Sequence, residues 1–399
     1  MKVVQINATC GSGSTGKICV AVSELLTNAG TENYILYTQG KSNYSLGIRY
    51  ASKKYIKIQA LKSRVFGNYG FNSHLATIRL IHLLDRIKPD IIHLHNIHGH
   101  DCNLSILFRY LKRKKTKIVW TFHDCWAFTG LCTYFDYVKC TRWKDTCEQC
   151  PQKKGYSWFF DRTGTMHKRK KKLFAGLNMT IITPSQWLAD LVKQSFLKDY
   201  PVRVIHNGID LSVFKPTPSD FRKRYGIAPE KKILLGVAFG WGARKGLDVL
   251  VDLAKRLDEK YYQIVLVGTD DNVDKQLPDS IISIHRTQNQ AELAEIYTAA
   301  DLFVNPTREE NYPTVNMESL ACGTPVLTFR TGGSPEILDE TCGAVVECAD
   351  VDALEREIGR ICVEQPYSLE SCLNRAEGFN HKKRFEEYVY LYRSCVGVS

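Results

Sequence analysis

Two glutamates in the C-terminal half of the chain lie eight residues apart, within the segment NPTREENYPTVNMESLACGTPVL. Glu310 follows an expected strand, and Glu318 lies about one and a half turns into an expected helix that begins at Pro313. A helix N-terminus offers free backbone N–H groups and a positive dipole, which suit a diphosphate. Carboxylates accept hydrogen bonds from sugar hydroxyls. The pair therefore predicts a site that binds the two ends of a nucleotide sugar.

A glycine-rich stretch near the N-terminus, GSGSTGKI, nearly matches the P-loop that cradles nucleotide phosphates. Gly11, Gly16 and Lys17 have the P-loop spacing, but Ile18 stands where the motif needs a Ser or Thr to hold magnesium. A P-loop NTPase also needs an apolar strand that ends in an acidic residue in the same domain, and the nearest candidate, IVLVGTDD, lies in the other half. A P-loop-like NTPase or nucleotide-binding protein is therefore an alternative that the sequence leaves open.

Five of the fourteen cysteines fall within 26 residues, in an insert that spans 125–172. Cys147 and Cys150 have the spacing of a zinc knuckle, and Cys132 and Cys140 complete a set of four thiolates for a structural zinc. The alternative is a set of buried thiols in an aromatic subdomain. The other nine cysteines are scattered and are interpreted as small buried apolar side chains.

A strand-and-helix pattern positions these segments. Apolar runs separated by helical patterns predict strands at KVVQINA, NYILYTQ, DIIHLHN, KIVWTFH, MTIITPS and VRVIHNG. After NGIDLSVFKPTPSD the pattern begins again with KKILLGVAFG, the loop WGARKG, a helix and the strand YQIVLVG. Such runs indicate parallel sheets, so we expect an α/β fold of two Rossmann-like, doubly wound domains. Because ligands of such sheets bind beyond the carboxyl ends of the strands, we expect the active site in a cleft that both domains face.

Charge is divided unequally between the two halves of the chain. Of 399 residues, 1–200 carry a net charge of +19 and 201–399 a net charge of −7. The basic clusters at 112–117 and 167–172 suit nucleic acid or an anionic membrane surface, and each basic residue contributes about 1 kcal/mol at such a surface. Solvated helix faces are the simpler interpretation. Because no nucleic-acid recognition fold is indicated, we expect no nucleic-acid partner. The chain lacks a long apolar run and a signal segment, so we expect a cytoplasmic protein, peripheral on the inner membrane face.

Together, the motifs resemble the family 4 glycosyltransferases of GT-B fold. That family's signature is Glu, seven residues and Glu, which Glu310 and Glu318 match, and further pieces follow in order over essentially the whole chain: PDIIHLHN, VWTFHD, ITPSQWL, VIHNGID, RKG, LVG, IYTAADLFVNP and TGGSPEIL. The resemblance implies a retaining transferase that moves a hexosyl unit from a UDP- or GDP-linked sugar to a saccharide or lipid-linked saccharide. The implied pathway is the synthesis of capsule, exopolysaccharide or O-antigen.

The resemblance assigns catalytic roles to His123, Glu310 and Lys245. His123 matches the acceptor-side histidine, whose neutral imidazole can accept a hydrogen bond from the transferred sugar or the attacking hydroxyl. No cofactor is required for catalysis in this scheme, because positive charge and backbone amides stabilise the diphosphate leaving group. The family's arginine position holds Gly240, which leaves Arg244 as the nearby substitute. The donor-binding residues so implied are Gly13, Gly16, Arg244, Lys245, Glu310, Tyr312, Thr314, Val315 and Glu318.

The domain roles follow from the same resemblance. Residues 1–205 are expected to form an acceptor-binding domain with the cysteine-rich insert, and 206–380 a nucleotide-sugar-binding domain. Residues 381–399 are expected to form a helix that packs back on the N-terminal domain. A glycoside hydrolase that uses Glu310 and Glu318 as acid and nucleophile is a second alternative.

Overall fold

In the computed structural model, which describes residues 1–397, the chain divides into two compact units. The first contains Met1–His206 and the C-terminal helix from Lys382, and the second contains Asn207–His381. The expected boundary at 205/206 lies one residue before the observed one. The last two residues of the segment expected at 381–399 lie outside the described residues. No helix in the described part of the chain is both long and apolar enough to cross a membrane.

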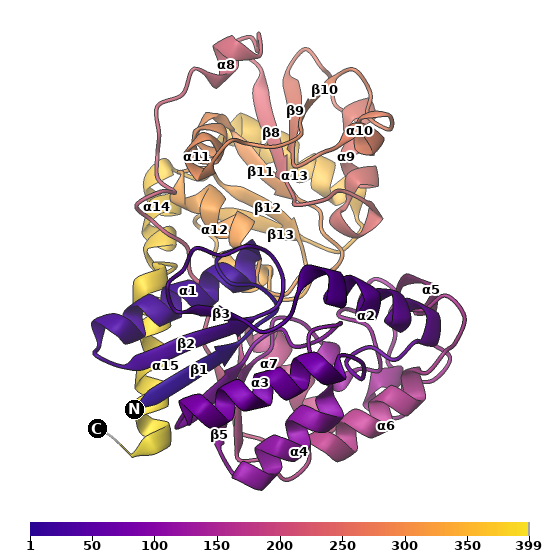
Figure 1. Cartoon of the computed structure of the whole chain (residues 1–399). Coiled ribbons are helices and arrows are strands. Elements are labelled where there is room, and N and C mark those ends of the chain that lie inside the picture. The colour runs from indigo at the N-terminus through magenta and orange to yellow at the C-terminus, as the bar shows by residue number, and fades with distance from the viewer. Residues whose placement is uncertain (398–399) are drawn as a thin grey trace. The chain divides into compact units, whose positions relative to one another are not determined.

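The first unit is built on a parallel sheet of seven strands in the order β3-β2-β1-β4-β5-β6-β7 (Figure 1). Its strands are β1 (Lys2–Ile6), β2 (Glu32–Tyr37), β3 (Gly47–Arg49), β4 (Ile91–Leu94), β5 (Lys117–Thr121), β6 (Met179–Thr183) and β7 (Val202–Val204). Its helices are α1 (Gly13–Asn28), α2 (Lys53–Phe66), α3 (His74–Ile87), α4 (Leu104–Lys114), α5 (Lys153–Tyr156), α6 (Thr163–Phe174), α7 (Gln186–Gln194) and α15 (His381–Val396), with 3-10 turns η1 (Trp126–Phe128) and η2 (Arg142–Lys144).

Both faces of this sheet are covered, which explains why its central strands are apolar at successive positions. Val4 and Ile92 pack in the core on the side of α3 and α4, whereas Val3 and Ile91 pack on the side of α1 and α15. On that second side, Tyr392 of α15 is completely buried. A parallel sheet buried on both faces needs such continuous apolar strands.

The second unit contains a parallel sheet of six strands in the order β10-β9-β8-β11-β12-β13. Its strands are β8 (Lys232–Val237), β9 (Tyr262–Val267), β10 (Ile281–Ile284), β11 (Leu302–Asn305), β12 (Val326–Phe329) and β13 (Gly343–Val346). Its helices are α8 (Phe221–Arg224), α9 (Leu247–Arg256), α10 (Asp271–Asp274), α11 (Gln290–Ala299), α12 (Thr314–Ala321), α13 (Val351–Glu364) and α14 (Leu369–Glu377), with 3-10 turns η3 (Ala243–Lys245) and η4 (Pro335–Ile337). Apolar cores lie on both faces here as well, so two doubly wound α/β units are present, as predicted.

Helix α1 begins earlier than the sequence pattern indicated. Apolar residues repeat at helical spacing in ICVAVSELLTNAG, which predicts a helix from Ile18, but the observed helix starts at Gly13. Gly11 and Gly13 have φ values of +72° and +67°, a conformation that glycine adopts without the strain of a Cβ. Residues 7–12 connect β1 to the helix, and Gly16 lies in the first helical turn rather than in a loop.

Candidate functional site

Three histidines gather where β4 and β5 end at the same edge of the first sheet. His93 lies in β4, His95 follows it, and His123 follows β5. The ring centroids of His93 and His95 lie 3.9 Å apart, on one face of the strand, as expected for residues two apart. Nδ1 of His95 lies 3.1 Å from Nε2 of His123. Burial lowers the pKa of His123 to about 4 and holds those of His93 and His95 well below the usual value of a histidine. All three imidazoles are therefore neutral near pH 7.

A hydrogen-bonded chain sets the tautomer of His123. Gln5 donates from Nε2 to the carbonyl of Cys19 over 2.9 Å, so its Oε1 is the acceptor that faces His95. His95 donates to this oxygen from Nε2 over 3.0 Å. Its Nδ1 carries no proton and accepts from Nε2–H of His123. Neutral His123 consequently has its proton on Nε2, and Nδ1 is its basic nitrogen.

A cavity lies next to His123. It is lined by His95, Asn96, His98, Trp120, Asp124 and Trp126, among others. His98 and Asp124 form an ion pair of 3.0 Å on its wall. Although burial opposes protonation of His98, the carboxylate of Asp124 outweighs it and raises the pKa of His98. The cavity therefore combines a neutral imidazole with a hydrogen-bonded pair of histidine and carboxylate, and it is a candidate acceptor site within the first unit.

The glycine-rich stretch Gly11–Gly16 contains two predicted donor-binding residues, Gly13 and Gly16, that have different structural roles. A Cβ on Gly16 would lie 2.6 Å from Oγ1 of Thr9, which itself donates to the carbonyl of Ser12. A Cβ on Gly13 would meet nothing within 4 Å. Gly16 is thus required for packing, whereas Gly13 faces space in which a ligand can approach the backbone.

Substitutions at these two glycines should separate the two roles. Gly16→Ala is expected to lower the free energy of unfolding by about 1–3 kcal/mol, because the methyl group overpacks the loop. Gly13→Ala is expected to cost about 1–2 kcal/mol of backbone strain at its positive φ and, in addition, to raise KM for the donor. Urea unfolding and donor KM measure the two effects. An unchanged KM in Gly13→Ala would contradict a donor contact at this residue.

In the second unit, the structure brings together two of the predicted catalytic residues. Lys245 ends η3, Glu310 lies in the loop after β11, and their side chains form a close ion pair. These side chains are 21% and 17% exposed. The second carboxylate oxygen of Glu310 accepts from the backbone N–H of Asn311 over 3.2 Å. A cation and a carboxylate are thus both presented at the carboxyl edge of the sheet.

Tight backbone contacts hold this loop in place. A Cβ on Gly246 would lie 2.3 Å from the carbonyl of Pro306, and one on Gly332 would lie 1.7 Å from the carbonyl of Glu310. Both glycines have positive φ, so no other residue fits without moving the chain. The position of Glu310 is therefore fixed by close backbone packing on two sides.

Arg308, which no sequence motif indicated, stabilises the loop after β11 that carries Glu310. It donates to both carboxylate oxygens of Asp248 over 2.7 Å and to the carbonyl of Ala243 over 2.5 Å. Its backbone N–H donates to the carbonyl of Arg244 over 2.9 Å. The side chain of Arg244 itself is exposed. Arg308 thus connects the loop of Glu310 to the turn that carries Lys245.

The first turn of α12 carries the remaining predicted donor residues. Thr314 and Val315 are half-buried at the start of this helix, directly after Pro313. The Tyr312 side chain is buried in the core of the second unit, and its backbone carbonyl accepts from Nδ2 of Asn207 over 3.5 Å. Glu318 accepts from the hydroxyl of Tyr297 over 3.2 Å. Glu310 and Glu318 therefore have different partners, a lysine and a tyrosine.

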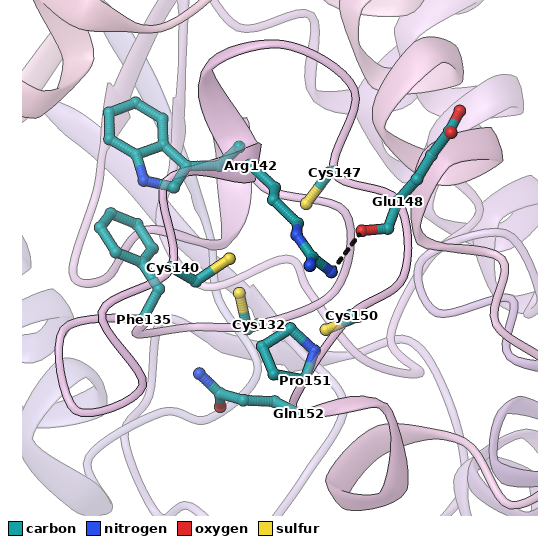
Figure 2. A pocket seen from close by; sticks show the side chains of 10 residues that line it. Cys132, Phe135, Cys140, Arg142, Cys147, Glu148, Cys150, Pro151 and Gln152 are labelled. Carbon is teal, nitrogen blue, oxygen red and sulfur yellow. Dashed lines mark hydrogen bonds between the residues drawn. The ribbon is translucent and has the colours of Figure 1, made fainter.

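The four predicted zinc ligands surround one cavity in the insert (Figure 2). Cys132, Cys140, Cys147 and Cys150 all line it, together with Phe135 and Trp143. All four are free thiols. Sequence residues up to 18 apart are thus gathered around a common space, although η2 is the only regular structure between the first and last of them among the described residues.

The basic clusters lie at the end of α4 and along α6, and they are neighbours. Lys112 donates from Nζ to the carbonyl of Lys172 over 3.3 Å. Two members of the cluster at 167–172, His167 and Lys170, are buried. For these two residues, the interpretation as a solvated or surface-binding cluster is wrong. The helical period turns these two side chains toward the insert while their neighbours face solvent.

Two glycosyltransferase family models match the chain. A model described as "Glycosyltransferase Family 4" matches residues 19–213, and one described as "Glycosyl transferases group 1" matches residues 231–363. The glycosyl transferase WcaC of Escherichia coli (strain K12), whose name assigns it to colanic acid biosynthesis, is 23% identical over 99% of this chain and 100% of that protein. A D-inositol 3-phosphate glycosyltransferase of Mycolicibacterium smegmatis is 28% identical over 42% of this chain and 41% of its own.

Solved structures share the fold over nearly the full length. Sucrose-phosphate synthase from Thermosynechococcus elongatus superposes with a TM-score of 0.72 at 19% identity over all of both chains. Anabaena Alr3699/HepE, solved in complex with UDP-glucose, gives a TM-score of 0.69 at 14% identity over 99% of each chain. The two parallel sheets, the motif-bearing loops and the two family matches agree. The chain belongs to the group 1/family 4 glycosyltransferases and has the GT-B fold.

Proposed function

We propose that the enzyme transfers a hexosyl unit, with retention of anomeric configuration, from a nucleotide-diphosphate sugar to a saccharide or lipid-linked saccharide of a surface polysaccharide. The observation that carries this proposal is the ion pair of Lys245 and Glu310 beside the first turn of α12. A lysine and free backbone N–H groups suit a diphosphate, and a carboxylate next to them suits the hydroxyls of the attached sugar.

Each residue has a distinct task in this scheme. Lys245 and the N–H groups of Thr314 and Val315 stabilise the negative charge that develops on the departing diphosphate. Glu310 holds the donor sugar. Nδ1 of His123, whose tautomer is set by His95, accepts a hydrogen bond from the transferred sugar or the attacking hydroxyl. The positive charge of Lys245 takes the role that a metal ion has in other transferases.

The comparisons support a UDP-linked donor and a polysaccharide product. Anabaena Alr3699/HepE was solved with UDP and with UDP-glucose, and the name of WcaC places that relative in colanic acid biosynthesis. We therefore propose UDP as the donor nucleotide, with GDP as the alternative that an experiment must separate.

A donor panel tests this function. The full-length enzyme is mixed with UDP- and GDP-linked hexoses, and the shift in Tm ranks them. The best donor is then incubated with candidate acceptors, and release of nucleoside diphosphate is measured together with the anomer of the product by NMR. We expect release that depends on the acceptor and a product of retained configuration. Release without any acceptor, with free sugar as product, would favour hydrolysis and contradict transfer.

An exposed aromatic and basic surface on the first unit supports a lipid-linked acceptor. The aromatic residues Trp158, Phe159 and Phe160 are 54%, 65% and 47% exposed, and they adjoin α2, because the N–H of Trp158 donates to the carbonyl of Arg64 over 2.8 Å. Helices α2 and α5 lie side by side there (Figure 1). The same surface presents Ile58, Leu61, Phe66, Lys53, Lys54, Lys57, Lys62 and Lys154. Apolar side chains among lysines suit an anionic bilayer surface.

Removal of two aromatic side chains should weaken membrane binding. The double variant Trp158→Ser, Phe159→Ser is expected to bind phosphatidylglycerol-containing vesicles about tenfold or more weakly, because it loses apolar area that enters the interface. Co-sedimentation measures the binding, and Tyr390→Ser, at another exposed aromatic of the same unit, is the matched control. Equal binding to vesicles with and without the anionic lipid would contradict the proposal.

A further inference from the structure

We propose that the cavity of Cys132, Cys140, Cys147 and Cys150 binds one structural Zn²⁺ through four thiolates, and that Lys170 and Arg142 balance the charge of this centre. The four sulfur atoms face a common space (Figure 2). This inference concerns the insert alone and does not depend on the proposed donor or acceptor.

One of the four sulfurs accepts a backbone hydrogen bond, and the backbone of two of the cysteines is held by further hydrogen bonds. The N–H of Gly130 donates to Sγ of Cys147 over 3.1 Å. The N–H of Cys150 is held by Asp161 over 2.8 Å, and the N–H of Cys147 by the carbonyl of Arg142 over 2.9 Å. Second-sphere contacts of this kind orient the ligands of a metal and tune its affinity.

Burial favours the neutral thiol at three of the four cysteines. It raises the pKa of Cys147 to about 11 and raises those of Cys132 and Cys150 as well. The thiolates of Cys147 and Cys150 would raise the pKa of Cys132 further, since like charges repel. Because thiolate, not thiol, binds the metal, Zn²⁺ competes with protons for the sulfurs, and four bound thiolates give a centre of net charge −2. Metal binding should become stronger as the pH rises.

Two cations lie where this negative charge would form. Lys170 is completely buried, and its ammonium donates to the carbonyls of Trp126 and Thr129 over 2.6 and 3.1 Å. Burial lowers its pKa to about 7, while Cys147 and Cys132 act in the opposite direction. Arg142 lines the cavity and donates to the carbonyl of Glu148 over 3.1 Å (Figure 2). Besides these carbonyls, the ring of Trp126 lies 3.4 Å from the ammonium, and Asp124 also stabilises its charged form. A tetrathiolate zinc would add negative charge that offsets more of the cost of burying Lys170.

The sulfurs must move closer to bind the metal. Among the described residues, no three of the four sulfurs all lie within 4.8 Å of one another. The group that meets this distance is Asp271, Asp274 and His285 of the second unit. A tetrahedral site with Zn–S distances of about 2.3 Å brings sulfurs to about 3.8 Å. Zinc should therefore contract the loop of the insert and rigidify η1, which Lys170 contacts through Trp126.

Metal content and a cobalt spectrum test the proposal. Full-length enzyme purified anaerobically without chelator is expected to contain about one zinc per chain by elemental analysis. Replacement by Co²⁺ is expected to give the sulfur-to-cobalt charge-transfer and visible bands of a tetrahedral thiolate site. Cys150→Ser is expected to lose the zinc, whereas Cys348→Ser, which changes an exposed cysteine of the second unit, is expected to retain it.

Lys170→Met tests the charge partner while all four thiols stay in place. Its zinc affinity, measured by competition with a chromophoric chelator, is expected to fall about 10-fold to 100-fold. An unchanged affinity would remove Lys170 from the proposal. Wild-type enzyme that holds no zinc and gives no thiolate spectrum with Co²⁺ would overturn the site itself, and so would zinc that persists in Cys150→Ser. If Cys150→Ser does not fold, the cobalt spectrum of the wild type shows by itself whether thiolates bind the metal.

Discussion

Replacement of Lys245 by methionine is expected to lower kcat by about 10²-fold to 10³-fold while the enzyme stays folded. Lys245 carries the positive charge nearest to Glu310, and the donor diphosphate gains negative charge as the bond to the sugar breaks. An interaction that strengthens in the transition state changes kcat more than KM. Methionine is unbranched like lysine and one atom shorter, so it removes the charge with little disturbance of the packing. Steady-state kinetics with the best donor, together with Tm, measure the effect.

One further variant is a control for this prediction, and a second tests the other residue of the ion pair. Lys255→Met changes an exposed lysine of the same helix region and is expected to leave both kinetic constants unchanged. Glu310→Gln removes the other half of the ion pair and is expected to lower kcat as well, because the amide binds the sugar hydroxyls less strongly than a carboxylate. A Lys245→Met enzyme that is folded and fully active would contradict the proposed role of the lysine.

Loss of the His123 side chain is expected to lower kcat by about 10²-fold or more. Loss of the hydrogen bonds that keep its proton on Nε2 is expected to lower kcat by a smaller factor. His123→Ala removes the group proposed to accept the hydrogen bond. Gln5→Met removes the oxygen that receives the Nε2 proton of His95, so His95 no longer has to accept from His123. A fraction of His123 then carries its proton on Nδ1, where it is unproductive. Gln5→Met should therefore lower kcat with little change in donor KM.

The control is His82→Ala, which removes an exposed histidine of the same unit and should leave kcat unchanged. Urea unfolding of each variant separates a catalytic loss from a loss of folded protein. If Gln5→Met kept the wild-type kcat while His123→Ala did not, the hydrogen-bonded chain would have no part in catalysis.

As the pH falls, the activity that depends on His123 should stay constant while the free energy of unfolding decreases. Burial lowers the pKa of His123 to about 4, so its imidazole stays neutral and active as the pH falls from 8 to 5. In the unfolded chain its pKa is about 6.5, so between pH 6.5 and 4 the unfolded state binds a proton that the folded state does not. The free energy of unfolding should therefore decrease as the pH falls through this window. His123→Ala should reduce that decrease, and an activity midpoint near pH 6.5 assigned to His123 would contradict the burial argument.

Local sequence patterns were sufficient for most of the fold. The apolar strands and helical periods predicted two doubly wound α/β units, because a sheet buried on both faces requires continuous apolar strands. The strands β3, β10 and β13 lie at edges of the two sheets and are only partly buried, and they were not predicted. The start of α1 was placed too late, because positive φ at Gly11 and Gly13 is not visible in a hydrophobic pattern.

The sequence by itself determined which residues have the chemistry: the glutamate pair, the lysine before the helix, the histidine after a strand and the grouped cysteines. Only the tertiary structure decided their partners. The pairing of Lys245 with Glu310 joins positions 65 residues apart, and the contact of Gln5 with His95 joins positions 90 residues apart. The burial of Lys170 depends on which side of α6 packs on the insert. Such long-range contacts arise from the packing of the sheet edges and loops, so local sequence patterns do not predict them.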